Sequence, residues 1–299
     1  MAAGATDCVV VGGGPAGLTA AIYLARFRLK VRVFDGGRSR AALIPLTRNH
    51  AGFPNGVSGV ELLERMRAQA LKYGAEIISA TVDGLETTAD GFGVSVGNAI
   101  VPARTVLMAT GVYNRRPPMP EALHREALAR GLIRYCPVCD GYEVIDRAVA
   151  VVGTGEHGLR ETEFLRSYTS RLSLIAPEGP HAFTVAERAR LADLGVVVRD
   201  GPVGAFRLED AAIVVDTPGG PLRFDSVYPA MGSDVHSDLA RGLGVRLTDL
   251  GCIVVDAHQR SSLPGLYAAG DVVVGLDQIS HAMGEAGVAA TTIRNDLAG

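Results

Sequence analysis

The sequence predicts an α/β protein in which a unit made of a strand, a glycine loop, a helix and a second strand occurs twice. Three observations support this. The chain of 299 residues contains 37 glycines and is 47% hydrophobic, as expected for a globular protein with many tight turns. Residues 7–35 and 148–179 share the same pattern of strand, glycine triplet, helix and strand. A proline-rich stretch, 113–122, lies between them and predicts a linker.

The first unit begins with the apolar strand 8–11 and continues through a glycine loop into a helix over 15–26. The loop glycines have the spacing Gly-x-Gly-x-x-Gly: Gly12, Gly14 and Gly17. This spacing allows a tight turn, close approach of a pyrophosphate and a helix N-terminus that faces the phosphates. Asp35 follows the second strand, 31–34, where a carboxylate accepts hydrogen bonds from a ribose. Together these features predict a Rossmann-type dinucleotide site and not merely a structural turn.

The remaining elements around this unit follow from periodicity and glycine positions. We predict an amphipathic helix at 60–73 closed by Gly74, antiparallel strands at 91–111, strand patterning at 246–256, a strand and glycine turn at 266–275, and a final helix at 280–297.

The second unit has the triplet Gly153, Gly155 and Gly158. The segment after its second strand, 175–179, contains no arginine to hold the 2′-phosphate of NADPH. Glu178 is placed to serve an NADH ribose. The alternative is a Rossmann unit retained as scaffold, with an altered or absent nucleotide site.

A Cys-x-x-Cys pair, Cys136 and Cys139, lies near the middle of the chain with Asp140 directly behind it. Zinc is disfavoured because Cys8 and Cys252 lie in apolar strands and are predicted to be small core residues. A static disulfide over so short a loop would constrain the unfolded chain little. Redox exchange is therefore predicted, with Asp140 as proton carrier or, alternatively, as a turn residue.

Charge and hydropathy restrict the partners and the compartment. The net charge of −3 gives no indication of nucleic-acid binding, and no run of about 18 apolar residues or charged-then-apolar leader is present. Four cysteines in so long a chain are not a secreted disulfide framework. We therefore expect a cytoplasmic protein without membrane or nucleic-acid partners and without a metal.

Over nearly its whole length the chain resembles the low-molecular-weight thioredoxin reductases. The matching segments are GGGPAGLTAAIYLAR, GVELLERMRAQALKYGAEI, ATG, CPVCDG, the second glycine loop, GCIVVDAHQRSSLPGLYAAGDV and QISHAMGEAGVAA. The resemblance implies two Rossmann-like domains of the three-layer β/β/α type, the second inserted into the first. It assigns residues 1–115 and 243–299 to an FAD-binding domain, and 116–242 to a nicotinamide-domain-like insert that carries the cysteines.

The resemblance also implies residue roles. The residues that it implies bind the cofactor are Gly12, Gly14, Pro15, Ala16, Asp35, Asn49, Thr110, Gly111, Gly270, Asp271, Gln278 and Ile279. Asn49 and Gln278 would lie near the flavin ring, although polar turn residues are the alternative at both positions. Cys139 resembles the thiol that faces the flavin, Cys136 the one that attacks the outside disulfide, and Asp140 the general acid.

The predicted function is a homodimeric FAD-dependent disulfide oxidoreductase that reduces a thioredoxin-like protein or a small disulfide. Because Ala176, Pro177 and Glu178 replace the family's basic patch, the use of NADPH or NADH is uncertain. Ferredoxin or a second flavin are alternative donors. An oxygen-using dithiol oxidase is the alternative activity, although Asp140 stands where such oxidases usually carry histidine. A flavin redox sensor without turnover is a third alternative.

Overall fold

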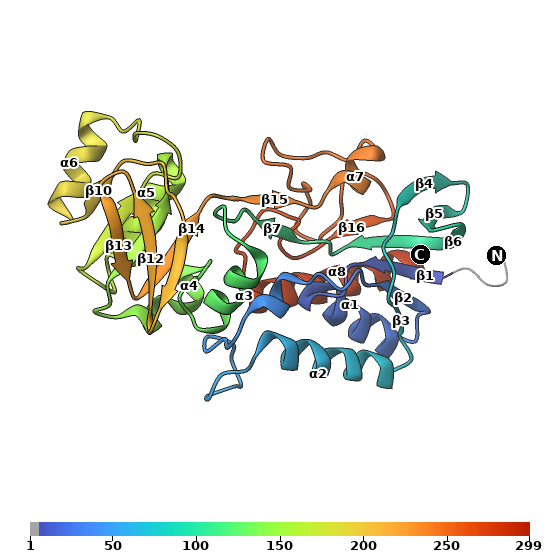
Figure 1. Ribbon diagram of the computed structural model, residues 1–299. Helices are drawn as coiled ribbons and strands as arrows, with labels where there is room; N and C mark the ends of the chain where they lie inside the picture. The colour runs from blue at the N-terminus through green and yellow to red at the C-terminus, as the bar shows by residue number, and fades with distance from the viewer. Residues whose placement is uncertain (1–5) are drawn as a thin grey trace. The chain divides into compact units, whose positions relative to one another are not determined.

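The computed structural model describes residues 6–299, which divide into two compact units (Figure 1). The first unit comprises the described residues up to Leu46 together with His50–Tyr113 and Asp234–Gly299. The second comprises Thr47–Asn49 and Asn114–Ser233. The chain passes between the units through β7 (Val112–Asn114) and β15 (Ser233–Val235), which pair with each other.

The crossing points differ from the predicted boundaries, which followed residues 115 and 242. The short helix α7 (Asp238–Gly242) contacts β4 (Gly84–Thr88), and its Ala240 is completely buried in the core of the first unit. Residues 234–242 therefore pack with the first unit. Packing of this kind depends on contacts distant in sequence, so composition alone does not place the boundary.

The first unit is built on a sheet with the strand order β3-β2-β1-β6-β5-β4, in which β16 also pairs with β6. Strands β3, β2, β1, β6 and β16 are parallel, whereas β5 and β4 are antiparallel additions. The remaining bounds are β1 Thr6–Val11, β2 Val31–Phe34, β3 Glu76–Ile78, β5 Gly91–Val96, β6 Ala99–Met108 and β16 Leu266–Ala268. The helices are α1 Pro15–Arg26, the 3-10 helix η1 Arg40–Leu43, α2 Gly59–Lys72 and α8 Ile279–Ala298.

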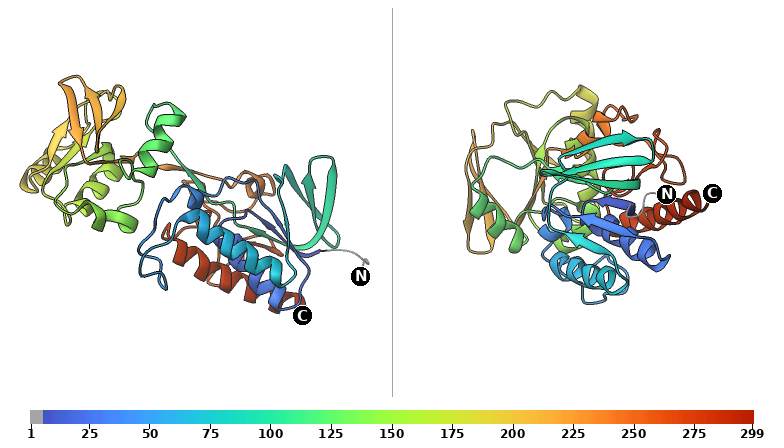
Figure 2. Two further views of the ribbon diagram at one scale, coloured as in Figure 1. Left: turned by 60° about the horizontal axis from the view of Figure 1, so that its bottom comes forward. Right: turned by 90° about the vertical axis from the view of Figure 1, so that its right-hand side faces the viewer.

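Alternation along β1 assigns the two faces of this sheet. Cys8 and Val10 pack with α1 and α8, whereas Val9 and Val11 pack with the cluster that includes Val245. Helices α1, α2 and α8 lie together on the first of these faces (Figure 2). Small residues throughout α1 and α8 allow these two helices to pack closely against each other.

The second unit has the predicted three-layer arrangement. A parallel sheet of order β10-β9-β8-β14 lies between helices and an antiparallel sheet of order β11-β12-β13. The strands are β8 Val149–Gly153, β9 Leu172–Ile175, β10 Val197–Arg199, β11 Phe206–Glu209, β12 Ala212–Thr217, β13 Gly220–Phe224 and β14 Ser226–Ala230. The helices are α3 Glu121–Ala129, α4 Pro137–Asp140, the 3-10 helix η2 Gly141–Val144, α5 Gly155–Leu165 and α6 Val185–Asp193.

Most predicted elements are present, and the expectations for residues 113–122 and 246–256 need correction in detail. The chain does pass between the units within the predicted linker at 113–122, but this stretch is not free of regular structure, because it contains the end of β7 and the start of α3. Residues 246–256 form only isolated bridges, Leu247 with Ile253 and Ile253 with Val273. Cys252 there is half-buried and lies outside the named strands, whereas Cys8 is in the core as predicted. Within residues 6–299, no helix combines the length and hydropathy needed to cross a bilayer.

Candidate redox and cofactor sites

The first glycine loop requires its glycines for steric reasons. Gly12 has a φ of +114°, and a Cβ built on it would lie 2.2 Å from the carbonyl oxygen of Ala109 and 3.3 Å from the amide of Thr110. A Cβ on Gly17 would lie 1.9 Å from the carbonyl oxygen of Gly12. Any side chain at either position would therefore push the loop away from β6 or from α1. This is the close backbone approach that the glycine spacing predicts.

The predicted cofactor residues of the first unit converge at the carboxyl ends of its parallel strands. A Cβ on Gly13 would lie 2.2 Å from Asp35 Cγ, which brings the acid at the end of β2 against the loop after β1. Gly270, after β16, has a φ of +81°, and a Cβ there would lie 2.9 Å from Ala16 Cβ. Ligands of open parallel sheets bind at this edge. The N-cap of α1 is Gly14, and no side-chain hydrogen bond caps its first turn.

Asp35 is held in place by two partners. It is 8% exposed, its Oδ1 accepts from the amide of Gly37 at 2.8 Å, and its Oδ2 pairs with Arg67 on α2. The structure thus holds the carboxylate at the end of β2, the position predicted for ribose recognition. Arg67 was not identified from the sequence, because its helix is far from Asp35 along the chain.

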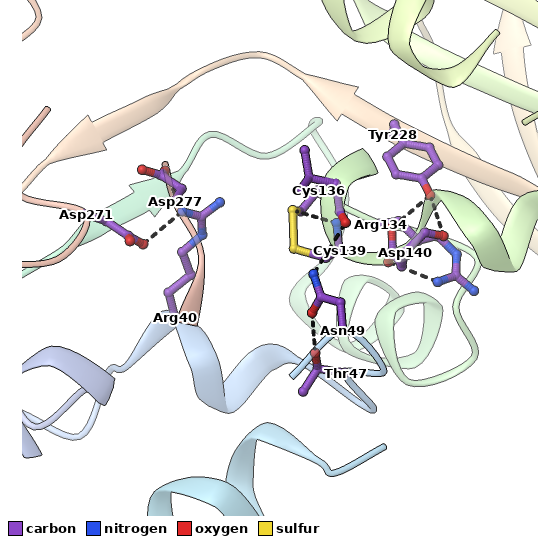
Figure 3. The surroundings of a disulfide bond; sticks show 11 residues. Arg40, Thr47, Asn49, Arg134, Cys136, Cys139, Asp140, Tyr228, Asp271 and Asp277 are labelled. Carbon is purple, nitrogen blue, oxygen red and sulfur yellow. Dashed lines mark hydrogen bonds and ion pairs between the residues drawn. A yellow bond between two sulfur atoms is a disulfide. The ribbon is translucent and has the colours of Figure 1, made fainter. Parts of the chain in front are cut away.

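Asp271 lies in an ion-pair cluster that the sequence did not predict. Arg40 on η1 contacts Asp271 Oδ2 at 3.0 Å and Asp277 Oδ2 at 2.7 Å, as Figure 3 shows. Burial raises the pKa of Asp271 above its usual value and the charge of Asp277 raises it further, while Arg40 lowers it. Arg40 therefore offsets the repulsion that the Asp277 charge exerts on Asp271.

We expect Arg40→Gln to destabilise the protein increasingly as the pH rises. The pKa of Asp271 is raised in the folded state. Its contribution to the stability of the fold is therefore complete at a pH below its pKa in the unfolded chain. That contribution is lost as the pH rises through its pKa in the folded protein. Without Arg40 the folded pKa rises further, so the variant should lose about 1–2 kcal/mol near pH 7 and much less near pH 4. Thermal unfolding of both proteins from pH 4 to 8 measures this.

The control for Arg40→Gln is Arg65→Gln, which removes an exposed pair with Glu61 within α2. An Arg40→Gln effect that is the same at every pH, or no larger than that of Arg65→Gln, would contradict the predicted role of the cluster.

The start of α8 provides two further predicted residues. Gln278 is its N-cap and Ile279 its first residue. Nearly two turns later Glu285 accepts a hydrogen bond from the amide of Gly270 at 2.7 Å and contacts His281 at 3.0 Å. Glu285 was not predicted, but it fixes the turn that presents Asp271.

In the second unit the cysteine pair is a disulfide at the start of a short helix. Cys136 is the N-cap of α4, and the amide of Cys139 donates to Cys136 Sγ at 3.1 Å. Pro137 occupies the first helical position, where its missing amide hydrogen is harmless. An N–H that points at a sulfur stabilises the thiolate of that sulfur. The Cys139 amide is therefore placed to donate to a thiolate on Cys136.

Asp140 is bound on both carboxylate oxygens. Its Oδ2 accepts from Arg134 at 2.9 Å, and its Oδ1 accepts from the hydroxyl of Tyr228 on β14 at 2.8 Å (Figure 3). Burial raises the pKa of Asp140, whereas the Arg134 charge and the Tyr228 hydrogen bond lower it. Burial likewise raises the pKa of Tyr228, and the Asp140 charge adds to that increase. Neither Arg134, six residues before Asp140, nor Tyr228 was predicted to contact this acid.

Asn49 belongs to the second unit. Its Nδ2 donates to the carbonyl oxygen of Val138 at 3.4 Å, and its Oδ1 accepts from Thr47 at 2.9 Å. The structure therefore brings Asn49 to the cysteine turn, and its place near the flavin ring stays a prediction.

The second glycine loop keeps the Rossmann geometry but has altered surroundings. A Cβ on Gly158 would lie 2.9 Å from the carbonyl carbon of Gly153, a close contact like that of the first loop. The hydroxyl of Thr154, the N-cap of α5, contacts His181 Nδ1 at 3.2 Å. Glu178 is exposed in the turn after β9. Arg199 lies opposite Ile175 on the neighbouring strand, a basic residue at this edge that local sequence did not indicate.

Comparison with known proteins gives consistent results. The model of the family described as pyridine nucleotide-disulphide oxidoreductase matches residues 6–286. A thioredoxin reductase of Mycolicibacterium smegmatis is 34% identical over 281 residues, covering 89% of this chain and 88% of the relative. One from Eremothecium gossypii is 32% identical, with 88% of each chain covered. The crystal structure of thioredoxin reductase from Streptococcus pyogenes MGAS5005 superposes with a TM-score of 0.89 at 27% identity, covering 98% of each chain.

Proposed function

Since the chain belongs to the pyridine nucleotide-disulphide oxidoreductase family and is an FAD-dependent disulfide oxidoreductase, we propose that it reduces the disulfide of a thioredoxin-like protein. The observation that carries this proposal is the Cys136–Cys139 disulfide at the N-terminus of α4, with an acid directly behind it. The relatives described above are named thioredoxin reductases, which favours this activity over a dithiol oxidase or a sensor without turnover.

We assign FAD binding to the first unit. The steric requirement at Gly12 and Gly17, the uncapped first turn of α1 and the nearby Asp35 together suit a dinucleotide. The proposed contacts are those predicted from the sequence: Gly12, Gly14, Pro15, Ala16, Asp35, Thr110, Gly111, Gly270, Asp271, Gln278 and Ile279. Asn49 remains a proposed cofactor contact, and the structure places it at the cysteine turn. The second unit is proposed to be the nicotinamide-domain-like insert.

The cysteines would relay electrons by thiol–disulfide exchange. When bound and reduced, the flavin would supply the electron pair that reduces the Cys136–Cys139 disulfide to a dithiol. The Cys136 thiolate then attacks the outside disulfide, forming a mixed disulfide and releasing one thiolate, which takes a proton from Asp140. Cys139 next attacks Cys136 Sγ, which restores the internal disulfide and releases the second thiolate. The dithiol loses two electrons and the outside disulfide gains them. The hydrogen bond to Cys136 Sγ supports this order.

The test of this function is electron transfer to thioredoxin without a physiological donor. The full-length holoprotein, reduced anaerobically with dithionite and freed of excess reductant, is mixed with oxidised thioredoxin. Thiols that appear on thioredoxin in proportion to the reduced protein, detected by alkylation and mass spectrometry, are the expected result. If the reduced protein reacts with oxygen but leaves thioredoxin oxidised, the reductase proposal is wrong and the oxidase alternative is favoured.

We expect NADPH to be a poor electron donor. The turn after β9 carries Ala176, Pro177 and Glu178, so arginines that would hold a 2′-phosphate are missing from it. Anaerobic titration of the oxidised protein with NADPH and NADH, followed by flavin absorbance, measures this directly. NADPH should reduce the flavin slowly and with no advantage over NADH. Rapid stoichiometric reduction by NADPH would contradict the prediction and would indicate that Arg199 on β10 supplies the missing charge.

The proposal also covers the electron donor, the disulfide acceptor and the oligomeric state. A slow reaction with nicotinamides would leave ferredoxin or a second flavin as donor, and a small disulfide remains the alternative acceptor. We further propose a homodimer, which sedimentation of the full-length protein tests. The cytoplasmic location stays a prediction from the sequence.

A further inference from the structure

Two side chains without a role in the exchange described above hold the acid behind the cysteine pair. Arg134 Nη1 lies 2.9 Å from Asp140 Oδ2, and the Tyr228 hydroxyl lies 2.8 Å from Oδ1 and 3.3 Å from the carbonyl oxygen of Asp140. Both carboxylate oxygens are thus directed by donors from different parts of the chain. Figure 3 shows the carboxylate between them.

The two donors are anchored to adjacent positions of one strand. The amide of Arg134 donates to the carbonyl oxygen of Val227 at 2.9 Å, and Tyr228 is the next residue of β14. Tyr228 is completely buried, so its ring is fixed by the core around β8 and its hydroxyl requires a polar partner. Strand β14 therefore contacts both Arg134, which precedes the cysteine pair, and Asp140, which follows it.

Burial strengthens the electrostatic interactions within this group of side chains. The Arg134 and Asp140 side chains are only 19% and 23% exposed, so their attraction is weakly screened compared with that of surface pairs. Glu143 is the other charged group near Asp140 and raises its pKa, but Glu143 itself pairs with Arg48 at 3.4 Å. The groups that shift the pKa of Asp140 besides the effect of burial are therefore Arg134, Tyr228 and Glu143.

We propose that Arg134 and Tyr228 are positioning residues that orient the Asp140 carboxyl group and set the pH range in which it protonates the thiolate leaving from an attacked disulfide. This inference rests on the proposed role of Asp140 in the exchange. In the step concerned, the Cys136 sulfur forms a bond to one substrate sulfur, the substrate S–S bond breaks, and the departing sulfur receives the proton of Asp140. Arg134 and Tyr228 stay unchanged in charge and make no bond to the substrate.

The test compares two disulfides that differ in their leaving thiolate. Dithiobis(nitrobenzoate) releases a weakly basic aromatic thiolate that needs no acid, whereas bis(2-hydroxyethyl) disulfide releases a strongly basic alkyl thiolate that does. The full-length holoprotein is reduced with dithiothreitol, desalted anaerobically and mixed with each disulfide from pH 4.5 to 9. The ratio of the alkyl to the aromatic rate cancels the fraction of attacking thiolate and reports on the acid. Neither nicotinamide nor thioredoxin is needed.

The reference variant is Asp140→Asn, which should lower this ratio about 100-fold at pH 6 and make it independent of pH. In Arg134→Gln the pH at which the ratio falls to half its maximum should move upward by about one unit, and in Tyr228→Phe by about half a unit, because each change removes an interaction that lowers the pKa of Asp140. Tyr228→Phe keeps the buried ring, so it remains informative if Arg134→Gln folds poorly. The matched control is Arg130→Gln, which breaks an exposed pair with Glu126 and should leave the ratio unchanged.

The outcomes separate this inference from the proposed function. If Asp140→Asn retains the pH-dependent ratio, Asp140 is not the acid and both ideas fail at that residue. If Asp140→Asn flattens the ratio while Arg134→Gln and Tyr228→Phe follow the wild type, only the positioning role is overturned. Equal loss of both rates, with the ratio unmoved, would show that Arg134 and Tyr228 support the fold and nothing more.

Discussion

Cys136→Ser and Cys139→Ser should each lower turnover of thioredoxin by roughly a thousand-fold or more, while flavin remains bound. Each thiol has a separate task in the proposed exchange, so neither replaces the other. The two variants should nevertheless differ. Cys139→Ser retains the attacking Cys136 and lacks the thiol that resolves the mixed disulfide, so a covalent adduct with thioredoxin should persist. Non-reducing electrophoresis and intact mass spectrometry detect such an adduct.

The control for the cysteine variants is Cys252→Ser, because Cys252 is a half-buried free cysteine outside the disulfide. It should retain turnover. An adduct that persists in Cys136→Ser and not in Cys139→Ser would reverse the assignment of the two thiols, despite the hydrogen bond from the Cys139 amide to Cys136 Sγ.

Gly12→Ala should abolish FAD binding. The added Cβ would lie 2.2 Å from the carbonyl oxygen of Ala109. In addition, the φ of +114° at Gly12 is unfavourable for alanine. A backbone atom cannot move aside as the end of a side chain can, so we expect a cost of about 3 kcal/mol or more. The flavin-to-protein absorbance ratio of the purified variant should fall below about a tenth of the wild-type ratio.

A matched control for Gly12→Ala is Gly284→Ala on α8. A Cβ at Gly284 meets nothing within 4 Å, and alanine favours the helix, so flavin content should be unchanged and the melting temperature equal or higher. If Gly12→Ala retains a full complement of FAD, the first glycine loop is not the dinucleotide site.

Much of the fold was accessible from local patterns. The strand at residues 8–11, the glycine spacing after it and the amphipathic helix near 60–73 all appear in the structure. Helix α2 also shows why such predictions succeed: the Ser58 hydroxyl accepts from the amide of Glu61 at 3.1 Å, and Gly74 follows the helix with a φ of +93°. These signals act within one or two turns, so they are readable in the sequence.

The expectations that failed depend on longer-range contacts. Residues 246–256 have an alternating apolar pattern but find no continuous strand partner, so they form isolated bridges. A pattern indicates which side chains prefer burial, whereas pairing requires a neighbour with free backbone groups. For the same reason the contact between α7 and β4, which places residues 234–242 in the first unit, could not be predicted.

The chemistry divides in the same way. Cys136, Cys139 and Asp140 lie within five positions of the sequence, so the redox pair and its acid can be recognised without the structure. The glycine loop can be recognised in the same way, because its spacing reflects steric requirements within a single turn. The partners that tune these groups come from distant segments: Arg40 reaches Asp271, Arg67 reaches Asp35, and Tyr228 reaches Asp140. Folding brings these charges and hydroxyls together beside carboxylates that are largely buried. The proton chemistry of the exchange therefore depends on contacts that exist only after folding.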